Sequence, residues 1–289
     1  MSKKIVIVGG VAGGASTAAR MRRMDEEAEI VVFEKGKYIS FANCGLTYDI
    51  GEVIEERDKL LVQTPAAMEA RFNIDVRIQN EVIDIDREKQ QVVVKDLDKN
   101  KKYSESYDYL ILSPGADPIK PPLPGVDAEN VFTLRNIPDT DQIKEYIDEK
   151  KPEKAVVVGG GFIGLEMVEN LQEIGISVAL VEMLDQVMSQ FDYEMAAMIH
   201  NHLRTEGVDL YLSNALEEIE HEQGKTRVKL ENKDTIETDM VFLGLGVSPN
   251  TELAEKAGLE LGETGAIKVD QHLQPSDNNI YALGDAIEV

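Results

Sequence analysis

The chain contains a single cysteine, Cys44, which is the first candidate for chemistry. It lies in the stretch S-F-A-N-C-G-L, where Ser40, Asn43 and Gly45 form a polar, turn-like neighbourhood. A free cysteine can also be a small buried hydrophobe, so a core position is the alternative. A helix that begins near Asn43 would place the sulfur at a positive helix end and favour the nucleophilic thiolate. We therefore expect a catalytic cysteine, whose oxidised form is a mixed disulfide, a persulfide or a sulfenic acid, because no second cysteine is present to pair with it.

A second candidate is the segment G-G-G-F-I-G at 159–164, which has the glycine spacing of a dinucleotide site. Gly159 would make the tight turn, Gly161 would let the backbone approach a pyrophosphate, and Gly164 would let helix and strand pack closely. The acid Glu182, farther along the chain, would accept hydrogen bonds from ribose hydroxyls. A tight turn without a ligand is the alternative.

The segment G-G-V-A-G-G at 9–14 is a weaker copy of this pattern. It keeps Gly9 and Gly14 but has Val11 at the second glycine position, and Glu34 stands at the place of the acid. Because the pattern occurs twice in one chain, we expect two different dinucleotides.

The elements that would position these motifs also repeat. Each glycine turn lies between two continuous apolar runs with a helix-forming stretch between them, which is typical of buried parallel strands. Segments that alternate or run apolar follow the first copy at 81–86, 91–96 and 105–112, which suits an antiparallel meander that leads back into a buried strand at 109–112. The second copy repeats this at 215–219, 227–230 and 240–243. The predicted fold is α/β, with two Rossmann-like dinucleotide-binding domains, each with a parallel sheet plus an antiparallel meander.

Two segments suit crossovers between these domains, the Pro-rich 114–125 and a stretch near 244–251. We therefore predict a first domain in two parts, 1–118 and 246–289, with a second domain inserted at 119–245.

The amino-acid composition limits the kinds of partner that the protein is expected to bind. Lys plus Arg is 30 and Asp plus Glu is 54, a net charge of −24. So acidic a surface disfavours nucleic acid and anionic membranes. With one cysteine, no recognisable signal peptide and no apolar run long enough to span a membrane, a cytoplasmic location is expected. The four histidines lack metal-ligand spacing, so no metal is expected.

Three further motifs accompany the two glycine motifs: S-P-G at 113–115, G-L-G-V-S-P-N at 244–250 and I-Y-A-L-G-D-A at 280–286. With all of these, the whole chain resembles the FAD-dependent pyridine nucleotide-disulfide oxidoreductases. The stretch Y-I-S-F-A-N-C-G-L is similar to the single-cysteine branch of that family, the coenzyme A-disulfide reductases and rhodanese-fused CoA persulfide reductases. L-R-N-I-P-D-T-D at 134–141 also fits this branch. Thr47 and Asp49 depart from the proline and aromatic residue often found after the cysteine.

The resemblance implies a role for each matching residue. The first domain would bind FAD and the inserted domain NADH, with Cys44 as the redox-active centre. The FAD residues would be Gly9, Gly14, Glu34, Ser113, Pro114, Gly115 and Asp285. The NADH residues would be Gly159, Gly161, Gly164, Glu166 and Glu182. The CoA substrate would be bound by Ser16, Arg20, Arg23, Ser40 and Asn43.

Three of these assignments have alternatives. Glu166 is also interpretable as an acid in the first turn of a helix, where it would complement the helix dipole. The arginines, which include Arg22, are also interpretable as a solvated basic face. Since the stretch E-M-L-D-Q-V that begins at Glu182 contains no arginine, the charge of this acid should repel a 2′-phosphate and favour NADH over NADPH.

The implied reaction passes electrons from NADH through FAD to an oxidised Cys44, which then attacks a CoA disulfide or persulfide. An NADH oxidase or peroxidase that cycles through a sulfenic acid is the first alternative. A truncated dinucleotide-binding fragment without catalysis is the second, because the family's C-terminal dimerisation domain, which forms a homodimer, is absent from a chain that ends at residue 289.

Overall fold

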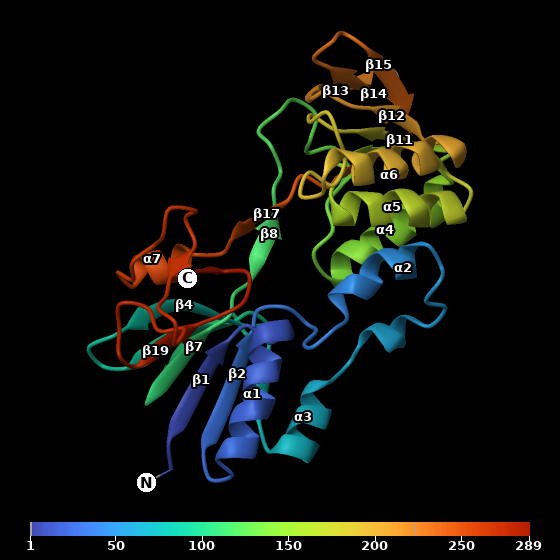
Figure 1. Cartoon of the computed structure of the whole chain (residues 1–289). Helices are drawn as coiled ribbons and strands as arrows, with labels where there is room; N and C mark the ends of the chain where they lie inside the picture. The colour runs from blue at the N-terminus through green and yellow to red at the C-terminus, as the bar shows by residue number, and fades with distance from the viewer. Residues whose placement is uncertain (1, 223) are drawn as a thin grey trace. The chain divides into compact units, whose positions relative to one another are not determined.

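The computed structural model describes residues 2–222 and 224–289, which form two compact units (Figure 1). The first comprises the described residues up to Ala42, then Leu61–Asp117 and Ser248–Val289; the second comprises Asn43–Leu60 and Pro118–Val247. Residues 43–60, which we predicted in the first domain, therefore pack in the second unit. None of the helices in the described part of the chain has both the length and the apolar character needed to cross a membrane.

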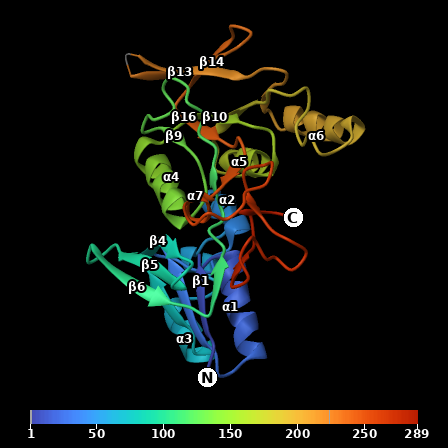
Figure 2. The same ribbon diagram turned by 90° about the vertical axis from the view of Figure 1, so that its left-hand side faces the viewer.

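The first unit is built on a parallel sheet of five strands in the order β19-β7-β1-β2-β3. Their bounds are Ile280–Ala282 for β19, Tyr109–Leu112 for β7, Lys4–Val8 for β1, Glu29–Glu34 for β2 and Asp75–Ile78 for β3. Helices α1 (Ala12–Met24) and α3 (Pro65–Phe72) cover one face. On the other lies an antiparallel meander of β4 (Asn80–Asp86), β5 (Gln91–Asp96) and β6 (Lys101–Ser106) (Figure 2).

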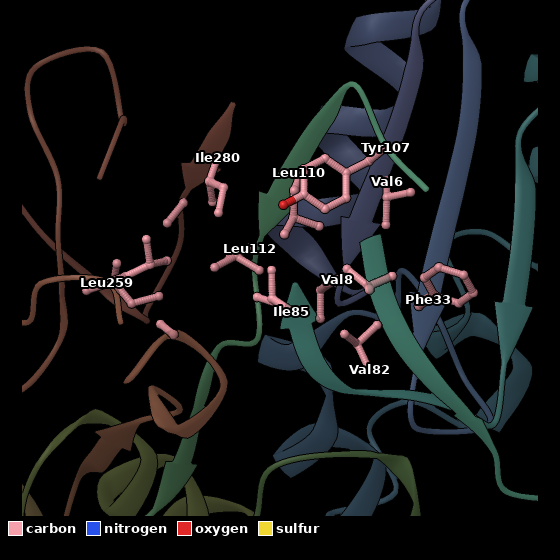
Figure 3. Packing of buried hydrophobic residues seen from close by; sticks show 14 of the residues in the cluster. Val6, Val8, Phe33, Val82, Ile85, Tyr107, Leu110, Leu112, Leu259 and Ile280 are labelled. Carbon is pink, nitrogen blue, oxygen red and sulfur yellow. The ribbon is translucent and has the colours of Figure 1, made fainter. Parts of the chain in front are cut away.

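Alternate residues of the central strands explain why both faces are covered. Ile5 and Ile7 of β1 pack with the helices, whereas Val6 and Val8 pack with the meander residues. Figure 3 shows the second of these clusters, in which Val8 lies near Val82 and Ile85. Since successive side chains of a strand point to opposite faces, a continuous apolar run is what a strand covered on both sides needs.

The second unit repeats this plan. Its parallel sheet has the order β12-β11-β10-β16-β9, with β12 at Asp209–Tyr211, β11 at Ser177–Val181, β10 at Lys154–Val158, β16 at Met240–Leu243 and β9 at Val131–Phe132. Its meander is β13 (Leu216–Glu222), β14 (Lys225–Leu230) and β15 (Thr235–Thr238). Its longer helices are α4 (Ile137–Lys150), α5 (Phe162–Glu173) and α6 (Tyr193–Thr205). The predicted α/β class with two such domains is confirmed.

Shorter elements complete the chain. The segment Asn43–Leu60 contains the 3-10 turns η1 (Asn43–Gly45) and η2 (Arg57–Leu60) and the helix α2 (Leu46–Ile50). Near the crossovers lie the short strands β8 (Ala116–Pro118) and β17 (Val247–Pro249), and the last part of the first unit adds α7 (Glu252–Lys256), β18 (Ile267–Lys268) and β20 (Ile287–Glu288). The sequence analysis missed the edge strands β3 and β12, which are short and at most half-buried, so they lack the apolar run that marks the central strands.

Candidate functional site

The first glycine turn joins β1 to α1, and backbone crowding requires two of its glycines. Gly9 has φ +95°, and a Cβ on it would lie 2.0 Å from the carbonyl oxygen of Ser113. A Cβ on Gly14 would lie 1.8 Å from the carbonyl oxygen of Gly9. The structure therefore gives a physical reason for both predicted glycines, because the helix and the strand approach each other at backbone distance.

The second glycine turn, between β10 and α5, has the same geometry and one further feature. Gly159 has φ +107°, and a Cβ on Gly164 would lie 1.9 Å from its carbonyl oxygen. A Cβ on Gly161, by contrast, would have no described atom within 4 Å. No packing within the described chain therefore requires glycine at position 161, and the open space in front of it suits a group that approaches the backbone.

The acids at the ends of the second strands are held by the glycine turns. The two carboxylate oxygens of Glu34 accept hydrogen bonds from the backbone N–H groups of Gly10 (2.8 Å) and Gly36 (2.7 Å). Glu182 accepts in the same way from Gly160 (2.6 Å) and from the residue two positions after the acid (2.8 Å). The sequence analysis missed this bridge, which fixes each carboxylate beside its turn and leaves further lone pairs on the oxygens for a ligand.

The turn at 113–115 lies against the first glycine turn. The N–H of Ser113 donates to the last residue of β1 (2.8 Å), and Gly115 has φ +71°. Asn250 holds this turn, since its backbone N–H donates to the Gly115 oxygen (2.9 Å) and its side chain donates to the Pro114 oxygen (3.3 Å). Asp285 is exposed in the turn that follows β19. All of these predicted FAD residues thus belong to one compact unit.

The basic residues of α1 divide into two kinds. Ser16, Arg20 and Arg23 are exposed along the helix. Within residues 2–222 and 224–289, neither Arg20 nor Arg23 makes a hydrogen bond or an ion pair through its side chain. Arg22 is different, because it is buried and its guanidinium donates to four backbone carbonyls at the ends of α1 and α3, with distances of 2.7 to 3.2 Å. Arg22 is therefore a structural residue, and only Arg20 and Arg23, the two arginines predicted to bind the substrate, remain on the exposed basic face of α1.

Ser40, another predicted substrate residue, is tied to the first glycine turn through its backbone. It has φ +43°, and its N–H donates to the carbonyl oxygen of Gly10 (2.9 Å). Its own carbonyl oxygen accepts from the N–H of Val62 (2.9 Å). The chain is thus fixed beside the first glycine turn just before it enters the cysteine-bearing segment.

Cys44 is exposed and forms no disulfide, so the alternative of a sealed core position is wrong. It lies in the 3-10 turn η1, and α2 starts only at Leu46 and has five residues. The helix expected near Asn43 therefore begins there as a 3-10 turn and continues as α2. Asn43 Oδ1 is buried and has no hydrogen-bond partner in the described part of the chain, and such an unsatisfied acceptor in the residue before Cys44 suits a donor from a bound molecule. Both residues belong to the second unit.

Glu166 lies in the second turn of α5, since this helix begins at Phe162 and has no acid in its first turn. Its interpretation as a first-turn acid is therefore wrong. Instead, Glu166 Oε2 accepts a hydrogen bond from Thr47 Oγ1 at 3.3 Å. This contact joins the helix after Cys44 to the helix after the second glycine turn, within one unit.

Tyr48 also lies near these groups, and the sequence analysis missed it. The carboxylate of Glu169 raises the pKa of the Tyr48 phenol, followed in effect by Glu166, burial and Cys44. The phenol therefore stays protonated at neutral pH and is a hydrogen-bond donor in the surroundings of the thiol.

His200 of α6 supports the loop that follows Glu182. It is buried, and its Nε2 accepts a hydrogen bond from the N–H of Val187 at 3.2 Å. Burial, and then the charge of Arg204, lower the pKa of His200. The same loop donates from the N–H of Met188 to the oxygen of Gly160 (2.9 Å), so it is anchored to the second glycine turn. Among the described residues no group of three or more His, Cys, Asp or Glu could hold a metal ion.

Comparison with known proteins agrees with this geometry. Over 287 residues the chain is 39% identical to an NADH oxidase of Methanocaldococcus jannaschii, and over 285 residues it is 37% identical to a coenzyme A disulfide reductase of Staphylococcus haemolyticus. Each match covers 99% of this chain but 63% of the relative, so the chain spans less than two thirds of the length of these relatives.

Solved structures agree as well. Reduced Bacillus anthracis CoADR-RHD superposes with a TM-score of 0.97 at 56% identity, over 99% of this chain and 51% of that one. A NAD-dependent persulfide reductase from A. fulgidus superposes with a TM-score of 0.94 at 40% identity, over 98% of this chain and 53% of that one. A family model for pyridine nucleotide-disulphide oxidoreductases matches residues 3–289. With two glycine turns, their acids and an exposed thiol on one chain, this protein belongs to the pyridine nucleotide-disulphide oxidoreductase family.

Proposed function

We propose that this chain binds FAD and NADH and reduces a coenzyme A disulfide or persulfide through the thiol of Cys44. The observation that supports this best is the exposed sulfur of Cys44, which forms no disulfide and follows directly in sequence the residue with the buried and unsatisfied Asn43 Oδ1. The relatives named as a coenzyme A disulfide reductase and a persulfide reductase support the choice of substrate. The activity is proposed for the whole protein, since the chain spans 63% of its curated relatives.

The first unit fits the ADP half of FAD. Gly9 and Gly14 leave the backbone of the turn bare, and the carboxylate of Glu34 is already oriented by two N–H groups, so its remaining lone pairs can accept from ribose hydroxyls. The turn at 113–115 and Asp285 would hold the rest of the cofactor. When bound, FAD accepts two electrons from a nicotinamide and supplies them to sulfur.

The second unit fits NADH. The open space in front of Gly161 would take the pyrophosphate, and Gly159 and Gly164 would hold the turn in shape. Glu182 would accept from the ribose hydroxyls and repel a 2′-phosphate, which is the reason to expect NADH rather than NADPH. Glu166 would lie toward the nicotinamide end, where Thr47 fixes one oxygen of its carboxylate.

The chemistry of Cys44 follows from its isolation. Its thiolate attacks one sulfur of a CoA disulfide, so that the substrate S–S bond breaks, a Cys44–CoA disulfide forms, and one CoA thiolate leaves and takes a proton from water. Two electrons and a proton, the equivalent of one NADH, then return the mixed disulfide to a Cys44 thiolate and a second CoA thiol. With a CoA persulfide, attack on the outer sulfur leaves a persulfide on Cys44 instead, and the same electron pair releases it as hydrosulfide.

The substrate has phosphates, which an acidic protein must bind with placed cations. Arg20 and Arg23 project from α1 without protein partners in the described ranges, although the chain carries a net charge of −24. Ser16 lies on the same exposed side of this helix, and Ser40 and Asn43 lie on the chain that leads to the thiol. We propose that these five residues bind the CoA portion.

A second candidate function is that of an NADH oxidase or peroxidase, which the Methanocaldococcus jannaschii relative favours. In that case peroxide would oxidise Cys44 to a sulfenic acid, and no CoA would be needed. In that reaction no phosphate-bearing substrate would be present for Arg20 and Arg23 of α1 to bind.

The test uses the purified chain with added FAD under anaerobic conditions. We expect NADH to bleach the flavin absorbance, and CoA disulfide to restore it with release of two CoA thiols per NADH. Cys44→Ser should bleach in the same way but release no thiol. A Cys44→Ser variant that still reduces CoA disulfide would refute the mechanism. Turnover when oxygen or peroxide is admitted in place of CoA disulfide would favour the oxidase, and cofactor binding without any turnover would favour a non-catalytic fragment.

A further inference from the structure

The segment Asn43–Leu60 carries the cysteine and packs with the second unit, although its neighbours in sequence on both sides belong to the first. Helix α2, which follows the cysteine turn directly, contacts both α4 and α5 (Figure 1). The thiol therefore sits on the same compact unit as the second glycine turn, and what fixes α2 there determines where the sulfur is held.

One contact within this packing has an unusual composition. Asp49 of α2 is 1% exposed, and Lys144 of α4 lies 3.2 Å from its Oδ2 through Nζ. The same Nζ donates a hydrogen bond to the backbone oxygen of Asp49 at 2.7 Å. Neither carboxylate oxygen of Asp49 has a hydrogen bond from any described residue. Lys144 thus contacts α2 at two points, through an ion pair with the Asp49 carboxylate and through a hydrogen bond to the Asp49 backbone oxygen.

A buried carboxylate with a single ion pair is a poor source of stability, because the loss of hydration outweighs much of the attraction to its partner. Apolar residues of the same size would pack α2 as well or better. The pair does, however, select one position for the helix, because any shift of α2 separates the charges inside a poorly hydrated interior. Its geometry therefore suits a positioning role rather than a stabilising one.

Neighbouring contacts hold the segment at other points but do not replace this one. Farther along, Arg57 makes a two-point contact with Asp141, at 2.7 and 2.6 Å, also to α4. At the end of α2, a Cβ on Gly51 would lie 2.2 Å from Asn170 Oδ1 of α5. The pair of Asp49 with Lys144 lies between the Thr47–Glu166 hydrogen bond and these anchors, and among the described residues it is the ion pair nearest to Cys44 along the segment.

We propose that Asp49 and Lys144 are positioning residues for Cys44: their ion pair seats α2 against α4 and thereby fixes the turn that carries the reactive sulfur. The inference rests on the proposed function only in taking Cys44 as the reactive group. Both residues would act on the sulfur through α2.

The test compares three variants of the whole chain by two measurements that need no cofactor or turnover. Lys144→Met leaves the Asp49 charge without its partner, Lys144→Arg keeps the charge, and the double variant D49N/K144M removes both charges and serves if Lys144→Met does not fold. Amide hydrogen exchange reports how often α2 opens, and the pH dependence of Cys44 alkylation by iodoacetamide reports the surroundings of the thiol. Asp277→Asn, which removes the 2.7 Å contact of Asp277 with Arg87 in the first unit, is the matched control.

In Lys144→Met we expect exchange at the Gly51 amide, which donates to the oxygen of Thr47, to rise about tenfold while α5 is unchanged. The midpoint of Cys44 alkylation should move to higher pH, because an uncompensated carboxylate on the same short segment opposes the thiolate. Lys144→Arg should match the unmodified chain in both measurements. The double variant also loses the hydrogen bond from Lys144 to the backbone oxygen of Asp49, so it should keep the faster exchange, but without the shifted midpoint.

Two results would overturn the proposal. One is α2 exchange and Cys44 alkylation that stay unchanged in both Lys144→Met and the double variant. The other is exchange that rises equally throughout the second unit, or equally in the Asp277→Asn control, since the pair would then add only general stability. The Cys44→Ser experiment bears on redox chemistry alone, so failure of one proposal is distinguishable from failure of the other.

Discussion

Replacing Gly161 by alanine tests with one methyl group whether the second glycine turn holds the pyrophosphate of NADH. The backbone of Gly161 has φ −81° and ψ −173°, which any residue adopts, and an added Cβ meets no described atom within 4 Å. Alanine gains about 0.4–1 kcal/mol through the unfolded chain. As a poorer N-cap it loses a similar amount, so the net change in unfolding free energy should stay within about 1 kcal/mol.

The ligand, however, would need the space that the methyl group takes. We expect the Kd for NADH to rise at least about tenfold, which corresponds to about 1.4 kcal/mol. Gly164→Ala is the matched comparison, because its Cβ would lie 1.9 Å from the Gly159 oxygen and cannot be accommodated without moving α5. That overpacking should lower the unfolding free energy by about 1–3 kcal/mol or more.

The assay pairs urea unfolding, followed by circular dichroism, with titration of NADH fluorescence. We expect Gly161→Ala to lose NADH binding but keep its stability, whereas Gly164→Ala should lose both. A Gly161→Ala variant that binds NADH as tightly as the unmodified chain would refute this expectation, because the open space beside this glycine would then not be where the pyrophosphate lies.

Two further predictions concern a structural arginine beside two ligand-binding ones, and the pH dependence of stability. Arg22→Ala should lower the unfolding free energy by about 2–4 kcal/mol, because four carbonyls lose a charged donor, and should leave the KM for CoA substrates unchanged. The double variant of Arg20 and Arg23 to alanine should instead raise this KM and leave the unfolding free energy unchanged. Equal effects of both changes on unfolding and on KM would contradict this prediction. Because the pKa of His200 is lowered in the folded protein, the unfolded chain binds its proton more readily, so this residue's contribution to stability is complete above about pH 6.5 and is lost as the pH falls below that value. The variant His200→Gln keeps an acceptor for the N–H of Val187 but cannot titrate. As the pH falls from about 7.5 to about 5.5, it should therefore lose less unfolding free energy in urea than the unmodified chain does. Parallel curves of unfolding free energy against pH for the two proteins would contradict this role of His200.

Much of the fold was predictable because its signals are local. The apolar runs before and after each glycine turn predicted β1, β2, β10 and β11, and alternation predicted most of both meanders, since side-chain period follows directly from strand geometry. The glycines at 9, 14, 159 and 164 were predictable for the same reason, because close approach of helix and strand within one turn excludes a side chain. The exact element boundaries around Cys44 and Glu166 were not, since short helical turns lack a strong period.

Contacts between distant parts of the chain lie beyond such local patterns. The residue types do not predict that Glu34 and Glu182 accept hydrogen bonds from the glycine turns that precede them in the chain. Nor do they predict that Arg22 donates to carbonyls at the ends of two helices. Each of these depends on where a backbone N–H or carbonyl points after the chain has folded.

The sequence by itself therefore determined the duplicated α/β plan and named the thiol, the turns and the acids, because the spacing of these groups is built into short segments. Only the tertiary structure decided that Cys44 is exposed, that its segment packs with the second unit, and that Asp49 is buried against Lys144. That last pair is separated by 95 positions in the chain, and burial and charge pairing at such a separation follow from the packing of whole helices rather than from any local pattern of residues.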